Sequence, residues 1–457
     1  MHEFFGAIWS ALGGSGAGSI ERIDVTGEGD LPSVFAVSDF AAACVCGVGA
    51  AVAELIEARF DRASRIRVSR RLSSLWFGYS LRPVDWKLPS PWDPIAGDYP
   101  TVDGWIRLHT NAPHHREGAL AVLGVSASKD EVARVVSTWK AQALETAVVE
   151  KGGCAAEMRS VDAWREHPQG KHVAAEPLVA RRSTDDEATN GAVQSRSSPT
   201  AARPLLGLRV LDLTRVLAGP VATRALAGFG ADVLRIDSPN WDEPAVVPDV
   251  TLGKRCARLD LRDAAGRVRL RDLLRHADVL VHGYRADALE RLGLGVEARR
   301  EIRPGLIDVC LDAYGWTGPW RNRRGFDSLV QMSSGIADAG MRQLGKPRPT
   351  PLPVQALDHG AGYLMAAAAI RGVIEREKTR RGFEARVSLA RMAELLIRGP
   401  AGRVDAALAA EEGDWAPAIE RSAFGSSQRL RPPVQVGDAA MHWDRPAAPL
   451  GSSPPEW

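Results

Sequence analysis

The stretch from Leu208 to Leu311 constrains the fold most, because short apolar runs of strand type alternate there with segments of helical periodicity. We predict strands at 208–213, 231–237, 258–261, 279–282 and 307–311, and helices at 221–229, 264–275 and 286–293. Strands that alternate with helices form a parallel sheet, since each parallel connection must cross over the sheet. The sequence therefore predicts an α/β fold with a doubly wound parallel sheet, whose ligands bind at the carboxyl ends of the strands.

Changes of composition divide the 457 residues into five parts. We predict a large Rossmann-like domain over 204–400 and a small α+β domain over 99–180. The polar, Ser/Thr-rich segment 181–203 is typical of an exposed flexible linker. Residues 1–98 form an N-terminal helix/strand segment, and the Pro/Ala-rich residues 401–457 read as an extended strap.

The N-terminal segment also echoes part of the large domain. Asp39 opens an apolar helix that is followed by Arg67-Val68-Ser69, and Asp358 opens a similar helix that is followed by Arg386-Val387-Ser388. Matching the two requires a one-residue slip inside the helix. We interpret 1–98 as a partial repeat that arose by duplication or fusion. An acid at a helix start is ordinarily a cap, so we expect Asp39 to be structural.

Bulk properties exclude several classes of protein. Lys+Arg number 58 against 56 for Asp+Glu, so the chain has no overall basic field for nucleic acid. No run reaches the ~20 apolar residues that span a bilayer, and the first residues lack the pattern of a signal peptide. The five cysteines match no metal-ligand spacing. We expect buried free thiols, no metal, and a reduced, cytoplasmic location.

Two common chemistries of doubly wound sheets do not fit. Asp237 ends the second strand, where a dinucleotide-binding protein places its ribose-binding acid. However, the first turn, 214–220, lacks the G-x-G-x-x-G fingerprint, and Pro220 has no N–H for a pyrophosphate. A G-x-S-x-G nucleophile elbow is also absent from the sequence. The chain is therefore predicted neither to bind NAD nor to be a serine hydrolase.

Six motifs carry a resemblance to a known family. In chain order they are 206–220, 230–237, 253–255 with 259–261, 278–281 with 284–285, 314–319 and 325–331. This ordered set resembles the family III CoA-transferases, the CaiB/BaiF group that includes formyl-CoA and carnitine CoA-transferases, over about 204–397. Residues 101–178 resemble the small domain of the same family. That domain ordinarily follows the large one, so the order of domains is rearranged or partially duplicated.

The resemblance implies a reaction and a nucleophile. It places Asp358 at the catalytic aspartate and implies transfer of CoA from an acyl-CoA to a carboxylic acid through an aspartyl anhydride and an aspartyl-CoA thioester. CoA is then a substrate, and no cofactor is needed. We expect the helix start at His359-Gly360 to supply oxyanion donors, its dipole to keep Asp358 ionised, and its small residues to let substrate approach. A homodimer is also implied.

The resemblance further implies a set of residues that contact the CoA substrate. The cations among them would meet its phosphates, and the loop after the first strand would lie along the pantetheine. The positions carried over are Arg215, Val216, Leu217, Ala218, Lys254, Arg255, Tyr284, Arg285, Arg324, Phe326 and Asp327.

Two alternatives stay open at this point. Racemases of 2-methylacyl-CoA in the same family use a histidine that would fall at Phe326, and the absence of that base disfavours racemisation. The unusual domain order is compatible with a non-catalytic acyl-CoA-binding subunit, against which the intact Asp358 argues. The sequence names neither the acyl group nor the acceptor.

Overall fold

The computed structural model describes residues 1–14, 21–187, 197–285 and 287–457. Its centre is a seven-stranded sheet in the order β10-β9-β8-β11-β12-β13-β7. Six strands are parallel, and β7 pairs antiparallel with β13. The predicted doubly wound α/β fold is confirmed. The strands are β7 Ala180–Glu187, β8 Arg209–Leu213, β9 Asp232–Asp237, β10 Lys254–Arg258, β11 Val279–His282, β12 Ile307–Asp312 and β13 Arg381–Ser388.

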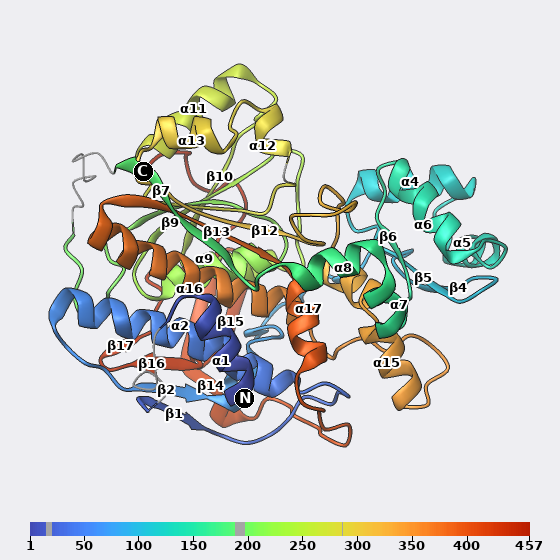
Figure 1. Cartoon of the computed structure of the whole chain (residues 1–457), viewed down its shortest axis with the longest axis horizontal. Helices are drawn as coiled ribbons and strands as arrows, with labels where there is room; N and C mark the ends of the chain where they lie inside the picture. Colours follow the sequence, from blue (N-terminus) through green and yellow to red (C-terminus); the bar gives the residue numbers. More distant parts are fainter. Residues whose placement is uncertain (15–20, 188–196, 286) are drawn as a thin grey trace.

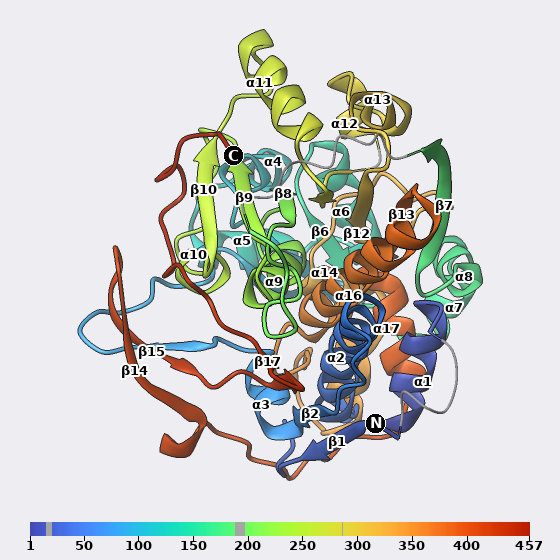
Figure 2. The same cartoon turned by 90° about the vertical axis from the view of Figure 1, so that its left-hand side faces the viewer.

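Helices cover both faces of this sheet (Figure 2). Alternate side chains of a strand point to opposite faces, so Val210 of β8 joins one apolar core and its neighbour Leu211 joins another. The helices over the Val210 face are α9 Ala218–Gly228 and α16 Ala356–Thr379, and over the other face lie α11 Ala264–Arg275, α12 Ala288–Arg291 and α13 Val296–Ile302. Because both faces are covered, the central strand β11 is buried at every position.

A second helix, α2 Val37–Phe60, lies beside α16 (Figure 1). It is long and apolar enough to cross a membrane, but 89% of its most apolar window is buried inside the protein. On its other side lies a four-stranded sheet in which β1 and β2 are parallel and β2, β16 and β17 are antiparallel. The elements are α1 His2–Ala11, β1 Ile23–Thr26, β2 Ile66–Ser69, α3 Arg70–Leu75, β16 Val434–Val436 and β17 Ala439–Ala440.

Helices α2 and α16 are counterparts in a local repeat. Each has 24 residues, and each ends at a left-handed residue, Asp61 or Arg380. The strand after each helix ends in a serine whose hydroxyl caps the next helix, Ser69 for α3 and Ser388 for α17 Leu389–Arg398. The interval from Asp39 to Ser69 equals that from Asp358 to Ser388. The two segments thus share the same spacing of helix, strand and cap, and their origin by duplication stays a prediction.

The two halves of the chain exchange strands. β7, from the first half, pairs antiparallel with β13, and β16, from the second half, pairs antiparallel with β2. The prediction of an exposed linker over 181–203 is therefore wrong at its start, since Ala180–Glu187 is an edge strand. Its charged side chains gave it the composition of a linker, yet charged residues are ordinary on an edge strand because only one side is paired. Residues 188–196 lie outside the described structure.

The segment 401–457 is not a plain strap either. It contains a hairpin of β14 Trp415–Ser422 and β15 Gly425–Leu430, and β15 pairs with β3 Leu81–Pro83. β16 and β17 follow in the same segment. An extended path was expected, but the partners that anchor the segment to the rest of the fold, β3 and β2, lie more than 300 positions earlier in sequence and no local pattern reveals them.

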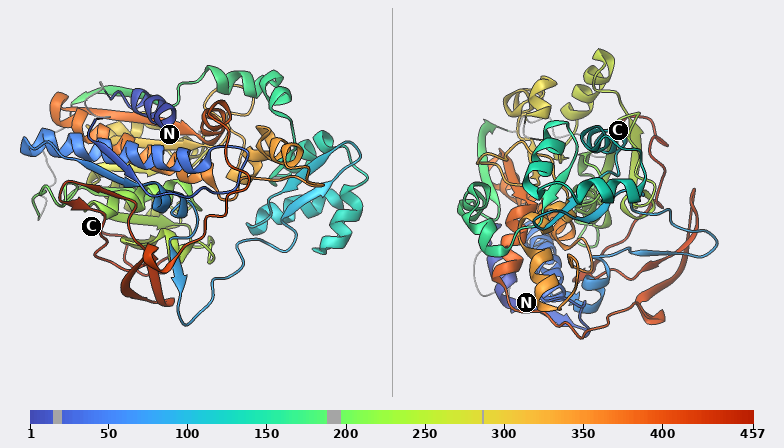
Figure 3. Two further views of the ribbon diagram at one scale, coloured as in Figure 1. Left: turned by 90° about the horizontal axis from the view of Figure 1, so that it is seen from below. Right: turned by 90° about the vertical axis from the view of Figure 1, so that its right-hand side faces the viewer.

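The small domain stands at one end of the molecule (Figure 3). Its antiparallel sheet packs against three helices around Ile106, Leu108 and Leu144. Two helices lead back to the large domain, and α14 contacts β6. The elements of this part are β4 Gly97–Pro100, β5 Trp105–Leu108, α4 Pro113–Leu123, α5 Lys129–Val136, α6 Ala141–Glu150, β6 Ala155–Glu157, α7 Val161–Glu166 and α8 Pro168–Ala175. The remaining helices of the large domain are α10 Val247–Val250, α14 Asp327–Ser333 and α15 Ile336–Gln343.

Candidate active site

Asp358 is the third residue of α16 and lies at the carboxyl ends of β8, β11 and β12. This residue is only 9% exposed, and no residue of the described ranges donates a hydrogen bond to its carboxylate. A buried carboxylate without partners is costly, and such groups concentrate at functional sites. The position is also where ligands of a doubly wound sheet bind.

The start of α16 is capped by a second carboxylate. Oδ2 of Asp327 accepts hydrogen bonds from the N–H groups of Leu357, at 2.9 Å, and Asp358, at 3.0 Å. The other oxygen of Asp327 binds the amide of Gln331, and the N–H of His359 donates to Gln355 at 3.1 Å. Asp358 is thus not the cap, and the expectation that the helix start at His359-Gly360 supplies oxyanion donors finds no support in these bonds.

The pair of carboxylates is protonated more readily than isolated ones. Burial, and then the charge of Asp327, raise the pKa of Asp358 well above its usual value. Burial raises the pKa of Asp327 to about 6, although the hydrogen bond from Asp358 and others oppose this. The expectation that the helix dipole keeps Asp358 ionised is therefore wrong, because desolvation and a like charge outweigh it. A poorly stabilised carboxylate is, for the same reason, a better nucleophile.

The small residues after Asp358 serve helix packing rather than substrate approach. A Cβ at Gly360 would come within 2.6 Å of the Phe40 ring on α2. A Cβ at Gly362 would come within 2.5 Å of the carbonyl oxygen of Ala218 on α9. These glycines let α16 lie close to both neighbours, and so hold Asp358 against the loop before α9.

One cavity, of about 320 Å³, leads from Asp358 along the strand ends. It brings together eight of the residues predicted to contact CoA. The guanidinium of Arg215 lies 4.5 Å from the centre of the Trp241 ring and 5.8 Å from that of Tyr284. The predicted residues that line this cavity are Arg215, Val216, Leu217, Ala218, Tyr284, Arg285, Arg324 and Phe326.

Val216 has a backbone conformation that β-branched residues rarely adopt. Its φ is +58°, in the left-handed region. Holding such a residue there costs about 1–3 kcal/mol, and strain of this kind clusters at ligand-binding loops. Val216 lines the cavities on both sides of Asp358. The β8–α9 loop is therefore shaped for contact with a ligand at a cost to stability.

A second cavity, of about 380 Å³, meets the first at Asp358. Its wall comes from three parts of the chain: Phe77, Tyr79 and Trp92 from the N-terminal segment, His109 from the small domain, and Trp241 from the large domain. Asp358 therefore lies between an arginine-lined cavity and one lined by aromatic rings. A reaction that exchanges a group between two molecules needs such a junction.

Lys254 and Arg255 line none of the four cavities found in the described ranges. The Lys254 amine is buried and donates to Asp212 at 3.0 Å, to the Pro220 carbonyl at 2.9 Å and to Thr223 at 2.6 Å. A cation with three internal acceptors is a structural ion pair, so a CoA contact from Lys254 is not part of the site. The Arg255 guanidinium pairs with Asp232 at 2.7 Å.

Sequence reasoning missed residues that the fold brings to the site. His109 stacks on Phe326 with ring centres 3.8 Å apart, and His115 meets the same ring at 5.7 Å. Burial lowers the pKa of His115 to about 3 and that of His109 well below its usual value, so both rings are neutral. The resemblance of 101–178 to the family's small domain was the one available signal, since the position of that domain is not readable from the sequence.

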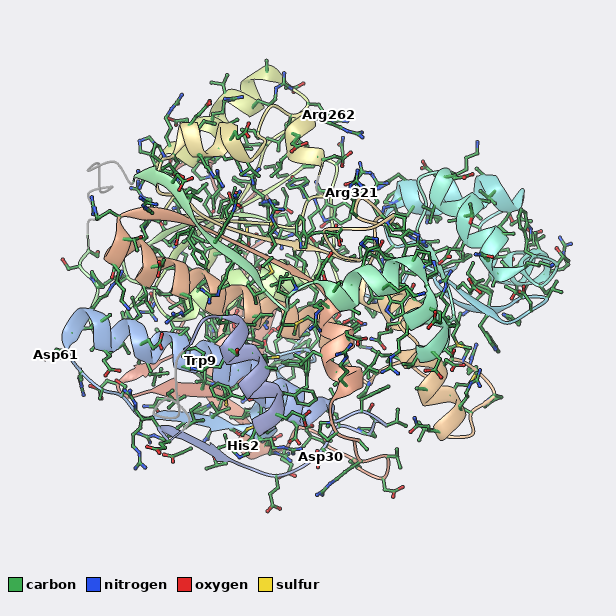
Figure 4. The ribbon with its side chains drawn as sticks, viewed as in Figure 1. His2, Trp9, Asp30, Asp61, Arg262 and Arg321 are labelled. Carbon is green, nitrogen blue, oxygen red and sulfur yellow. The ribbon has the colours of Figure 1, made fainter. Side chains whose placement is uncertain are left out.

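A third cavity, of about 720 Å³, opens beyond β9 and β10. Arg215 and Tyr284 line both this cavity and the first one, so the two are continuous. Arg262, labelled in Figure 4, contributes a further cation and pairs with Asp260 at 2.6 Å. The size and the cations suit the nucleotide end of an extended ligand.

Asp39, the counterpart of Asp358, lies in a different environment. Its Oδ1 accepts a hydrogen bond of 2.8 Å from Arg70, which also pairs with Asp30. Burial raises the pKa of Asp39, but the hydrogen bond and charge of Arg70 outweigh burial and the pKa is lowered. The carboxylate lines none of the cavities described above. Asp39 is therefore structural but is not the expected cap, since its partners are Arg70 and the amino group of Met1 rather than a helix N–H.

Parts of the chain are similar in sequence to known CoA-transferases. An acyl-CoA transferase of Gibberella moniliformis is 30% identical over 317 residues, which cover 64% of this chain and 54% of that protein. The human succinyl-CoA:glutarate CoA-transferase is 33% identical over 194 residues, 39% of this chain and 44% of that protein. The chain thus spans about half the length of the curated relatives it matches.

A crystal structure of a CAIB/BAIF family protein from Brucella suis is 26% identical and covers 49% of this chain and 65% of that one, with a TM-score of 0.40. This overlap is partial, and no conclusion about function rests on it. Residues 205–415 match CoA-transferase family III, and this span contains Asp358, Asp327 and the β8–α9 loop. Over this region the chain is similar to CoA-transferase family III.

Proposed function

We propose that the protein is an acyl-CoA:carboxylate CoA-transferase with Asp358 as its nucleophile. The observation that carries the proposal is the position of this buried, unpaired carboxylate at the junction of two cavities. The reactions named for the relatives, such as transfer between succinyl-CoA and glutarate, support the class of reaction. CoA is a substrate, and no cofactor takes part.

The first half of the reaction loads the enzyme. A carboxylate oxygen of Asp358 attacks the thioester carbonyl, the C–S bond breaks, and the CoA thiolate leaves a mixed anhydride behind. The thiolate then attacks the aspartyl carbonyl and expels the donor acid as a carboxylate. The product is an aspartyl-CoA thioester on Asp358.

The second half reverses these steps with another acid. The acceptor carboxylate attacks the aspartyl thioester and releases the thiolate, which then attacks the acyl carbonyl of the new anhydride. Acyl-CoA forms and Asp358 is regenerated as a carboxylate. Each step exchanges one leaving group for another, so the chain needs no oxidant, metal or external base. Within the described residues no cluster of metal-ligand type is present.

The arrangement of the first and third cavities supports a path for CoA. Arg215, Arg285 and Arg324 line the first cavity together with residues 216–218 and Asp358, and their charges suit the phosphates of CoA. Tyr284 borders both cavities. The pantetheine would run along the β8–α9 loop and bring its sulfur to Asp358.

Two further proposals concern the location of the protein and its assembly. The five cysteines are free and buried, which favours a reducing, cytoplasmic location. We also propose a homodimer. Within a single chain, β7 of the first half pairs with β13 of the second half, and β16 of the second half pairs with β2 of the first.

The proposal is tested by trapping the intermediate. The protein is incubated with a series of acyl-CoA donors, treated with hydroxylamine, and the modified residue is mapped by mass spectrometry. We expect a hydroxamate on Asp358 in the wild type and none in Asp358→Asn. A label on Asp39 instead would refute the assignment of the nucleophile. Exchange of the α-proton of a 2-methylacyl-CoA in deuterated water, without any acceptor acid, would point to racemisation.

A further inference from the structure

The two cavities that meet at Asp358 differ sharply in charge. Four arginines line the first, whereas the second has neither lysine nor arginine among its described lining residues. The first cavity suits the polyanionic CoA, which leaves the second for the acyl group of the donor and the acceptor. The arginines are Arg215, Arg285, Arg323 and Arg324.

We infer that the second cavity takes apolar monocarboxylic acids and rejects dicarboxylic acids. This inference rests on the proposed function and specifies its substrate class. A dicarboxylic acid uses one carboxylate at Asp358, and its other carboxylate must then lie in the second cavity. There it meets no cation, and it lies near the negative charges of Asp327 and Asp242.

The other acidic residues of the second cavity already have partners. Asp93 pairs with Arg116, Glu243 pairs with Arg235, and Asp249 pairs with two arginines. None of those arginines lines the cavity. The three acids are therefore paired with arginines that lie behind the cavity wall. A substrate carboxylate would therefore find no cation in this wall to pair with.

Aromatic rings make up much of the remaining surface. Phe77 is fully buried and stacks on His359, with ring centres 5.2 Å apart, and on Tyr363, at 5.9 Å. Trp92 meets the His109 ring edge to face at 6.0 Å. Burial lowers the pKa of His359 to about 3, so this ring is neutral and offers no charge to an anion. The wall is suited to an alkyl or aryl chain.

The test compares two acids that differ only at the far end of the chain. The aspartyl-CoA thioester is formed from hexanoyl-CoA, freed of donor, and mixed with hexanoate or adipate. The rate at which the thioester disappears is followed by mass spectrometry. We expect hexanoate to react about 100-fold faster or more, because the second carboxylate of adipate is buried without a partner.

The outcomes separate this inference from the proposed function. If adipate reacts as fast as hexanoate, or if adipyl-CoA loads the enzyme and hexanoyl-CoA does not, the inference is refuted and the proposed function stands. If neither thioester nor anhydride forms with any acyl-CoA donor, the proposed function itself fails.

A variant that places a cation in the cavity sharpens the test. Tyr79 lines the second cavity and is 39% exposed, so Tyr79→Arg can hold its guanidinium partly hydrated. We expect the rate ratio of adipate to hexanoate to rise about tenfold. Val84→Arg adds the same charge at a residue that is 58% exposed and outside the cavity, and should leave the ratio unchanged. An unchanged ratio in Tyr79→Arg, or an equal rise in Val84→Arg, would contradict the assignment of this cavity.

Discussion

Helices α2 and α16 hold the same acid at the same position, and only one of the two acids lies in a cavity. Each aspartate is the third residue of a helix of 24 residues, with a capping serine at the same distance beyond. The residue after that serine is Arg70 in one half and Leu389 in the other. Arg70 neutralises Asp39, whereas Leu389 lines the cavity beside Asp358.

This difference shows that backbone position alone does not make an active site. The helix dipole acts on both carboxylates alike, yet the pKa of Asp39 is lowered and that of Asp358 is raised. Deeper burial raises the pKa of Asp358, and the neighbours also differ, an arginine beside Asp39 and a second carboxylate, Asp327, beside Asp358. The reactive acid is the one that the fold leaves without a cation.

The largest expected effect separates the two acids directly. Asp358→Asn removes the nucleophile and should lower the transferase rate by about 10⁴-fold. Asp39→Asn leaves every cavity-lining residue in place, so the rate should change by less than about threefold. Steady-state rates of both variants with the same acyl-CoA and acceptor decide this. Equal losses in the two variants would contradict the contrast.

The next prediction gives Asp358 the arginine neighbour that Asp39 has. Leu389→Arg places the counterpart of Arg70 beside Asp358 and should pair with it. The pairing lowers the pKa and nucleophilicity of Asp358, so loading by acyl-CoA should slow by roughly 100-fold. Leu389→Met keeps the volume and serves as the control, with a change below about threefold. Unimpaired hydroxylamine labelling of Leu389→Arg would mean that the missing cation is not what makes Asp358 reactive.

The pH dependence tests the second carboxylate. Asp358 must be ionised to attack, so the rate of loading should fall as pH drops through its raised pKa. Asp327→Asn removes the like charge and should move this acid limb to lower pH. The amide also weakens the cap of α16, so the maximal rate should fall about tenfold. An acid limb that stays in place would show that burial alone sets the pKa of Asp358.

The smallest effect is on stability, and its sign differs between the two acids. The raised pKa of Asp358 means that its ionised form disfavours folding, a cost that shrinks as pH falls below that pKa and is gone below the usual value of about 3.8. Asp358→Asn should therefore add roughly 0.5–2 kcal/mol to the free energy of unfolding at pH 7.5.

The lowered pKa of Asp39 means that this group stabilises the fold above its usual pKa of about 3.8, and that the gain is lost as pH falls through the lowered value. Asp39→Asn should cost roughly 0.2–1 kcal/mol. Urea denaturation of both variants, at pH 7.5 and again at pH 4.5, measures the two signs. A loss of stability in both variants at pH 7.5 would break the contrast.

Much of the large domain could be predicted from the sequence, because its signals are local. The apolar runs of β8, β9, β11 and β12 give the parallel sheet, and the 214–220 turn fixes the loop beside Asp358. Eight of the residues expected near CoA line one cavity. Lys254 does not, because its buried acceptors lie on β8 and α9.

What could not be predicted depends on distant contacts. The strand β7 is polar because it lies at an edge, so its composition resembled that of a linker. The side chain of Asp327 caps the start of α16 from 30 and 31 residues away in sequence, and no local sequence pattern predicts this contact. The neutral histidines around Phe326 come from a domain whose placement only the folded chain shows.

The exchange of strands also has a consequence for how the chain is made. Val68 of β2 is synthesised early, and its antiparallel partner Val434 emerges hundreds of residues later. Until then that edge of the N-terminal sheet is open, and an open edge is a template for pairing with other chains. Closing so long a loop also slows folding. During synthesis, the N-terminal sheet cannot be completed until the last part of the chain has been made. We therefore expect chaperones that shield unpaired strand edges to raise the yield of folded protein.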